Sequence, residues 1–268
     1  LFNFGMLQFP GIVPIKINLT MIRSHLFLFL LFLCIGFGGC RHDKGTPDYK
    51  AYPEDVGKIV MTKCATSGCH NDRSKGAAGG LSMESWDKLF EGGNGSASVI
   101  PFRHDYSTFF SYVNTYKDLG VTLVPTMPYN KPALSKEEVL LLRDWINNGA
   151  PNKDGEIKFA DDPKRKKFYV TNQGCDVVTV FDRQTLLPMR YINIGSSSGI
   201  ESPHMIRISP DGDYWYVILL SGNYLEKYRT TDDRFIGKAF IGPGSWNTFV
   251  ISSDSKTAYC IDLNSNGK

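Results

Sequence analysis

A repeat in the C-terminal half restricts the possible folds more than any single motif does. Residues 208–217, ISPDGDYWYV, align with residues 251–260, ISSDSKTAYC, at an offset of 43 residues. An earlier copy begins at residues 167–172, KFYVTN, and continues through residues 176–182, DVVTVFD. β-Branched and aromatic residues that alternate between turns rich in Asp, Asn and Gly predict short antiparallel strands. A period of this length is typical of propeller blades, which bury their apolar faces against neighbouring copies.

These copies resemble the repeats of the YVTN family of β-propellers, in which each blade carries a Tyr-Val-Thr-Asn strand and a Ser-Pro-Asp-Gly turn. Both motifs are present, at residues 169–172 and 209–212. The resemblance implies an all-β propeller over residues 154–268. Propellers close with about four to eight blades, whereas this sequence holds two copies and the start of a third. We therefore expect the propeller to be incomplete in this chain and the sequence to belong to a longer reading frame.

His204 precedes the inner strand of its copy, and Asn247 occupies the equivalent place 43 residues on. Asn can replace His as a hydrogen-bonding group more easily than as a ligand or a catalytic group. We therefore expect a structural hydrogen-bonding role for His204.

Residues 64–72 read CATSGCHND, with two cysteines and a histidine directly after the second one. Covalent haem attachment uses two thiols, which form thioethers with the vinyl groups, and a histidine beside the second thiol that ligates the iron. Cys64, Cys69 and His70 supply these three groups. Four residues separate the cysteines, instead of the more common two.

Helical patterns surround this motif. Residues 53–63 have an apolar face, and short helices are expected near residues 83–90 and 107–116. The sequence SKEE at 135–138 is a capping box that opens an amphipathic helix ending at residues 149–151.

A sixth iron ligand is expected from a distant loop. Met127 lies in VPTMPY, residues 124–129, where prolines stiffen the backbone, and a thioether ligand raises the reduction potential of the iron. His104 is the alternative distal ligand and would give bis-histidine ligation with a lower potential. It lies among polar residues before a helix start, where a solvated or capping role suffices, so Met127 is preferred.

Residues 64–151 resemble the single-haem cytochrome c domains of bacterial envelope proteins. The shared features are the helix that runs into Cys-x4-Cys-His, the Met-Pro loop, and the C-terminal helix LSKEEV…WINNGA. The resemblance implies the class I cytochrome c fold, one covalent haem c, His70 and Met127 as axial ligands, and transfer of single electrons. The expected fold class is thus multidomain: an all-α class I cytochrome c-like domain at 53–153, followed by the all-β propeller.

Other interpretations of the cysteines remain open. A zinc site would have to use adjacent Cys69 and His70 on one ion, and no second close Cys/His pair is present. A Cys64–Cys69 disulfide is possible after export, and so is a Cys175–Cys260 disulfide.

The N-terminal region predicts export. Residues 21–25, MIRSH, form a short basic region, and residues 26–37 are an apolar run of 12 residues, which is too short for a membrane-spanning helix of about 20 residues and fits a signal peptide. Gly38-Gly39-Cys40 resembles a bacterial lipobox. We therefore expect a signal peptide at 21–39, lipidation of Cys40, a tether at 40–52 and an over-extended gene start at 1–20, which places the protein in the cell envelope as a periplasmic or surface-facing lipoprotein.

The net charge of +3 is too small to indicate nucleic-acid binding. The basic cluster at 164–167, KRKK, is interpreted as a solvated turn before a strand instead of a phosphate-binding patch.

The sequence thus favours a membrane-anchored c-type cytochrome that exchanges single electrons with a redox partner protein or a small-molecule donor, the propeller serving to dock the partner or substrate. No catalytic residues are predicted. One alternative is an oxidoreductase whose active site lies on the propeller, with the haem as an internal relay. The other is a haem-free propeller binding module with a Cys64–Cys69 disulfide.

Overall fold

The computed structural model describes residues 47–265. All the helices and strands described below lie within one compact unit that begins at Asp48. The predicted signal peptide and the lipidation site at Cys40 lie outside the described residues. Within residues 47–265, no helix is long and apolar enough to cross a membrane.

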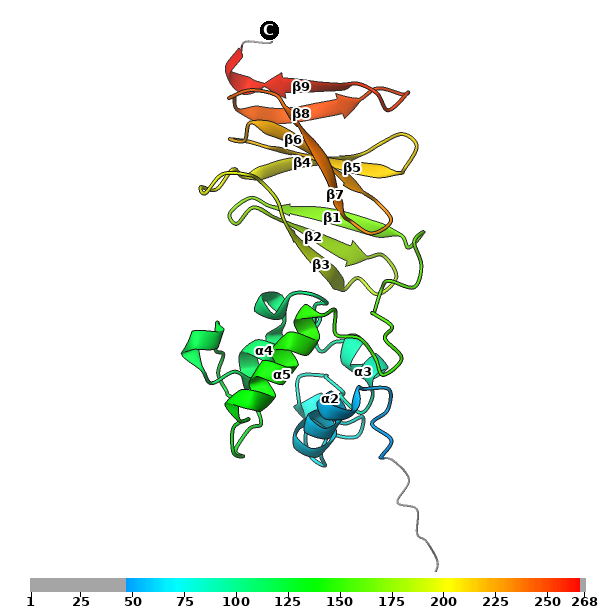
Figure 1. The fold of residues 1–268 in the computed structure, drawn as a ribbon, viewed down its shortest axis with the longest axis vertical. Coiled ribbons are helices and arrows are strands. Elements are labelled where there is room, and N and C mark those ends of the chain that lie inside the picture. The colour runs from blue at the N-terminus through cyan, green and yellow to red at the C-terminus, as the bar shows by residue number, and fades with distance from the viewer. Residues whose placement is uncertain (1–46, 266–268) are drawn as a thin grey trace, which may run out of the picture. The chain divides into compact units, whose positions relative to one another are not determined.

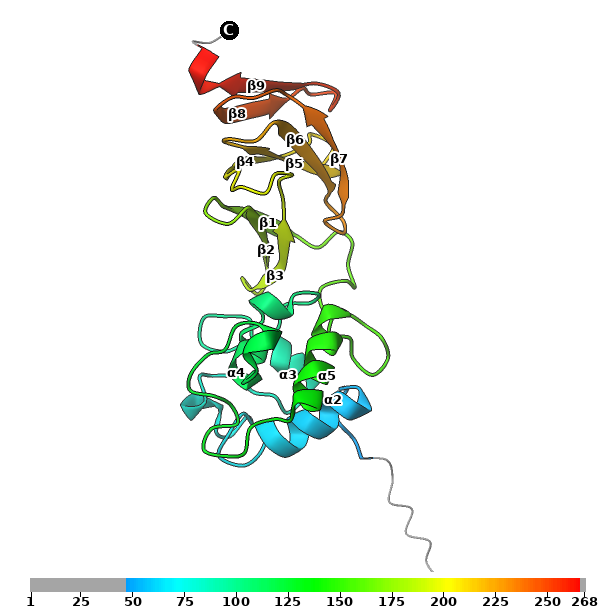
Figure 2. The same ribbon diagram turned by 60° about the vertical axis from the view of Figure 1, so that its left-hand side comes forward.

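Residues 48–153, here called the helical segment, contain short helices joined by long irregular connections (Figures 1 and 2). The α-helices are α2 (Glu54–Ile59), α3 (Trp86–Phe90), α4 (Thr108–Val113) and α5 (Lys136–Asn147). A π-helical turn, Val60–Cys64, continues α2, and 3-10 turns occur at Lys75–Ala77, His104–Tyr106 and Lys117–Leu119.

The capping box predicted at the start of α5 is confirmed. The Glu138 amide donates to Ser135 Oγ at 3.3 Å, and the Ser135 amide donates to Glu138 Oε2 at 2.9 Å. Val139, Leu142 and Ile146 then lie on one face, fully buried in the core. Spacings of three and four residues place these side chains on one side of the helix, so α5 is the central support of the segment.

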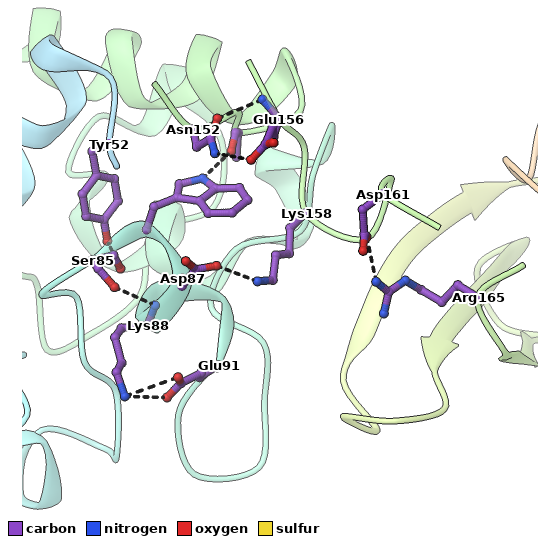
Figure 3. Close-up of polar contacts among 12 residues, drawn as sticks. Tyr52, Ser85, Asp87, Lys88, Glu91, Asn152, Glu156, Lys158, Asp161 and Arg165 are labelled. Atoms are coloured by element: carbon purple, nitrogen blue, oxygen red, sulfur yellow. Dashed lines mark hydrogen bonds and ion pairs between the residues drawn. The ribbon is translucent and has the colours of Figure 1, made fainter. Parts of the chain in front are cut away.

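The packed chain begins before residue 53, where the tether was expected to end. Tyr52 is buried, and its hydroxyl donates to the Met83 carbonyl at 3.2 Å and to the Ser85 carbonyl at 3.0 Å (Figure 3). Its ring packs in the same core as α5, 6.4 Å from the ring of Trp145. The hydroxyl finds backbone acceptors while the ring is removed from water, which fixes the chain at this point.

Residues 167–265, here called the sheet segment, form three antiparallel sheets. The first has the order β1-β2-β3, the second β4-β5-β6-β7, and the third β8-β9. Their strands are β1 (Lys167–Asn172), β2 (Val177–Asp182), β3 (Pro188–Asn193), β4 (Pro203–Ile208), β5 (Tyr214–Leu219), β6 (Tyr224–Arg229), β7 (Phe235–Phe240), β8 (Trp246–Ile251) and β9 (Ala258–Asp262).

The 43-residue repeat appears in space as contact between equivalent strands. β4 lies against both β1 and β8. His204 Nε2 is 2.9 Å from Asn247 Oδ1, and its Nδ1 is 2.8 Å from Gln173 Nε2. One residue on, the hydroxyl of Thr248 donates to Met205 Sδ at 3.0 Å. The expected hydrogen-bonding role of His204 is confirmed, and the bond joins equivalent positions of two copies.

An aromatic cluster fixes the first sheet against the second. Trp215 of β5 is fully buried and stacks on Tyr228 of β6, with ring centroids 4.1 Å apart. The ring centroid of Tyr169, on β1, lies 5.1 Å from that of Trp215. Asp233 accepts hydrogen bonds from Tyr169 Oη (2.9 Å) and Trp215 Nε1 (3.2 Å) and pairs with Lys167 (2.8 Å). The polar ends of the buried rings are therefore satisfied.

The predicted fold class, an all-α class I cytochrome c-like domain followed by an all-β propeller, is wrong. Residues 47–265 hold nine strands against four α-helices, and those helices are only 5 to 12 residues long. The strands form separate open sheets and do not close into a ring within the described residues.

The physical reasons differ for the two halves. Glycines at 92, 93 and 95 and prolines at 101, 125, 128 and 132 prevent helix over long parts of the helical segment. In the sheet segment, the repeat encodes strands and turns, whereas closure depends on how successive sheets are inclined, which no local pattern specifies.

Candidate functional site

The Cys64–His70 motif is a compact loop at the end of the π-helical turn. The His70 amide donates to the Cys64 carbonyl at 3.1 Å, and the Cys69 amide donates to the Thr66 carbonyl at 3.0 Å. Asn71 closes the loop, because its Nδ2 donates to the Thr66 carbonyl at 2.8 Å and its Oδ1 accepts from the Ser74 amide at 2.9 Å. The four intervening residues thus form an internally bonded turn that holds both cysteines close to His70.

His70 is half-buried, and its ring is oriented by the backbone. Nδ1 lies 3.3 Å from the carbonyl oxygen of Leu81, and the Met83 amide donates to the His70 carbonyl at 2.8 Å. Burial lowers the pKa of His70 below its usual value, which favours the neutral ring. A neutral ring with its proton on Nδ1 donates to Leu81 and leaves the lone pair of Nε2 available to a metal. Nε2 has no hydrogen-bond partner among the residues described.

Cys64 and Cys69 differ in environment. Cys64 is 5% exposed and belongs to the core cluster, whereas Cys69 is half-buried. Burial, with a smaller contribution from Cys69, raises the pKa of the Cys64 thiol to about 12. Both are free thiols, and so are Cys175 and Cys260.

We expect Cys64 to resist alkylation in the folded, haem-free protein. With a pKa of about 12, only about one Cys64 thiol in 10,000 is ionised at pH 8, and the thiolate is the reactive form. Raising the pH toward 12 should speed the reaction, because the fraction of thiolate rises. Iodoacetamide labelling followed by peptide mass spectrometry measures this, with exposed Cys175 as the internal control. Equal labelling of Cys64 and Cys175 at pH 8 would contradict the burial.

Met127 lies on a loop that returns to the motif. Its amide donates to the Tyr112 carbonyl of α4 at 2.9 Å, and its half-buried side chain packs against the core cluster that contains Cys64. Lys131, four residues on, donates to Thr66 Oγ1 inside the motif loop at 3.2 Å. The structure therefore brings the Met127 loop and the Cys64–His70 motif together.

His104 lies at the other end of α5. Its Nδ1 is 2.8 Å from Asn147 Oδ1 in the last turn of the helix, and its ring meets Phe110 edge-on. Lys63, the residue directly before the motif, pairs with Glu138 Oε2 in the first turn of α5 at 2.7 Å. Glu138 and Asn147 are separated by about 14 Å of helix at 1.5 Å per residue. His104 is thus held away from the motif.

No group of three or more His, Cys, Asp or Glu side chains in residues 47–265 is arranged to hold a metal ion, as a protein-only zinc site requires. The Cys64–Cys69 and Cys175–Cys260 disulfides are not formed.

Sequence reasoning missed the groups that orient His70. The Leu81 carbonyl is a backbone group, so no side-chain pattern points to it. Gly79 and Gly80 precede it with φ values of +66° and +76°, and a Cβ on Gly80 would overlap the side chain of Asn94. The Gly-Gly pair was the available signal, because it lets this loop turn back toward His70.

Comparisons with known proteins do not place the chain in a family. No family model and no curated protein matches the chain. Among solved structures, hydrazine synthase of Kuenenia stuttgartiensis is 26% identical with a TM-score of 0.33, over 42% of this chain and 29% of that one.

Putative 6-phosphogluconolactonases of Bacteroides uniformis and Bacteroides fragilis are 16% and 18% identical, each with a TM-score of 0.32. They cover 38% and 37% of this chain, and 32% and 29% of their own. The chain thus spans about a third or less of the length of these proteins, and TM-scores this low carry no argument about fold or function.

Proposed function

We propose that the helical segment binds one haem c covalently through Cys64 and Cys69 and transfers single electrons. The observation that carries this is the state of His70: its Nδ1 faces the Leu81 carbonyl at 3.3 Å, and its Nε2 has no partner within residues 47–265. A histidine held in this way, directly after the second of two free thiols, has the donor set that covalent haem attachment requires.

The residues present fit this group chemically. Cys64 and Cys69 are reduced and can form thioethers, His70 offers a neutral nitrogen, and Met127 offers a thioether from a loop that touches the motif. Because Cys64 is buried in the packed core, its thiol must react before the core closes. Attachment therefore precedes or accompanies folding of the helical segment.

Each residue has a distinct part in this proposal. The Leu81 carbonyl holds the proton on His70 Nδ1 and so keeps Nε2 unprotonated. Met127 would supply the second ligand, and the apolar core around Trp86 and Leu142 would exclude water. The bound haem supplies one-electron chemistry, and a thioether ligand with an apolar surround favours the reduced state. The electron donor or acceptor is a partner protein or a small molecule, for which the sheet segment provides the docking surface.

A pyridine haemochrome spectrum of the wild-type protein tests the proposal. The protein should be exported to the periplasm of a host that matures c-type cytochromes, purified and denatured. Haem that stays with the polypeptide, at one per chain and with the spectrum of a thioether-linked haem, supports the proposal. Purified protein without covalent haem from a host that matures a control cytochrome c contradicts it.

We further propose that Cys40 is lipidated and anchors the protein to a membrane of the cell envelope. Wild-type protein should partition with membranes, whereas Cys40→Ser should be released or left unprocessed, because acyl chains are the only apolar anchor proposed. Membrane fractionation with mass spectrometry of the mature N-terminus measures this. Wild-type protein found only in the soluble periplasmic fraction, with its N-terminus elsewhere, contradicts the lipidation.

A further inference from the structure

A hollow of about 650 Å³ lies outside the haem site, where the chain entering β1 meets the turn between β2 and β3. Its walls are the residues around Arg165 and residues 182–184. The volume falls within the range of about 300–1,000 Å³ found for small-molecule sites. Its lining is dominated by charged side chains, so the charge balance decides what it can hold.

Two carboxylates of the hollow are already neutralised. Asp182, whose side chain is 1% exposed, accepts from Arg165 Nη1 at 3.0 Å and from the amide and hydroxyl of Thr185 at 2.8 Å each. Asp161 pairs with Arg165 Nη2 at 2.7 Å (Figure 3). These bonds lower the pKa of both carboxyls, against the opposing effect of burial. Arg165 is therefore a structural cross-link between its two carboxylates.

Three cations of the hollow are left without a carboxylate. Lys164, Lys166 and Arg183 are exposed, and none forms an ion pair with any residue in the described part of the chain. The Arg183 amide donates to the Lys166 carbonyl at 3.0 Å. This bond fixes the backbone positions of Lys166 and Arg183 relative to each other. The remaining carboxylate, Asp162, accepts from the Lys164 amide at 2.8 Å.

A second observation also indicates a missing acceptor. Arg165 Nε is buried and has no hydrogen-bond partner among residues 47–265, although both its terminal nitrogens are bonded. Buried donors in native proteins nearly always have a partner. The lining of the hollow thus includes three cations without an ion pair and one arginine with an unpartnered donor.

We infer that this hollow binds a small, multiply charged oxyanion, of which phosphate is the representative chemistry. The four lysine and arginine side chains of the lining outnumber its three carboxylates, and such a positive surface raises the local concentration of anions. An arginine can also bind two oxygens of one phosphate together, while lysines act as point charges. The sequence alone favoured a solvated turn at 164–167. It could not show that Asp161 and Asp182 both form ion pairs with Arg165, or that Arg183 lines the same hollow as Lys164 and Lys166.

Isothermal titration calorimetry of the full chain with inorganic phosphate tests the inference. At low ionic strength we expect one saturable site with a Kd on the order of 1 mM. The triple variant Lys164→Ala, Lys166→Ala and Arg183→Ala should bind at least about tenfold more weakly. Glycerol phosphate as a second probe separates free phosphate from an organic phosphate, since the preferred ligand should bind more tightly.

A matched control loses the same charge elsewhere. Lys58, Lys117 and Lys256 are exposed, form no ion pair with any residue from 47 to 265 and do not line the hollow. Their triple replacement by Ala should leave phosphate binding within about twofold of wild type. Equal weakening in both variants would show a general charge effect and overturn the site, as would the absence of saturable binding in the wild type. Circular dichroism of each variant verifies folding, and none of these measurements depends on bound haem.

Discussion

Replacing both Cys64 and Cys69 by Ser should abolish covalently bound haem. Serine forms no thioether with a vinyl group, so denaturation of the variant should release any haem that remains. We expect the haemochrome signal that stays with the polypeptide to fall from one haem per chain to none. Denaturing gel electrophoresis with a haem stain gives an independent measurement of the same loss.

The matched control is the variant with Ser at Cys175 and Cys260, the other two free cysteines of the described chain. Both lie in the sheet segment, and covalent haem should stay at the wild-type level. If the control also loses its haem, or if the Cys64 and Cys69 variant keeps covalent haem, the attachment site is assigned wrongly.

Replacing Met127 by Ala should remove the sulfur-to-iron charge-transfer band of the oxidised protein while the haem stays covalently attached. The reduction potential should fall by an amount on the order of 0.1 V, because a thioether ligand stabilises ferrous iron and axial ligands tune the potential over a wide range. Absorption spectroscopy and potentiometric titration measure the two effects.

His104→Ala is the control for this prediction. His104 is bonded to Asn147 in the last turn of α5, whereas Lys63, directly before the motif, is bonded to Glu138 in the first turn. The band should therefore persist in His104→Ala. The reverse pattern, or a wild type that never shows the band, would exclude Met127 as the distal ligand.

Local elements were predicted well from the sequence. The capping box at Ser135 and Glu138 specifies where α5 begins, and alternating residues specify strands such as β2 and β5. These signals depend only on residues close together in the sequence, so they predict the local structure independently of the tertiary fold. The sequence predicted that His204 forms a structural hydrogen bond but did not identify the partner. That partner, Asn247, is set by the packing of β4 against β8.

The arrangement of these elements in space was predicted wrongly. An apolar face on residues 53–63 predicts a helix, and the chain is α-helical over Glu54–Ile59 but continues as a wider π-helical turn over Val60–Cys64. Residues 91–107 and 117–135 have the prolines and glycines that prevent regular helix, and their course is set by long-range bonds such as Met127 to Tyr112. The open sheets likewise depend on inter-sheet contacts, which a repeat spacing does not encode.

The side chains of the candidate site could be predicted from the sequence, whereas the backbone groups that position them could not. Cys64, Cys69, His70 and Met127 carry recognisable chemistry, whereas the carbonyl of Leu81 and the Asn71 turn carry none that a sequence pattern displays. Both act through backbone geometry, which exists only after the loop has folded.

The order of contacts among the three sheets has a consequence for local opening of the molecule. The middle sheet touches both neighbours, and the first sheet is also bonded to the helical segment, where Arg103 donates to the Tyr191 carbonyl at 2.7 Å. Strand β5 of the middle sheet is hydrogen-bonded on both edges, to β4 and to β6, and its residues Trp215, Val217, Ile218 and Leu219 are fully buried. Local opening at β5 must break contacts with both neighbouring strands and expose these side chains to water. Amide hydrogen exchange among the described strands should therefore be slowest in β5.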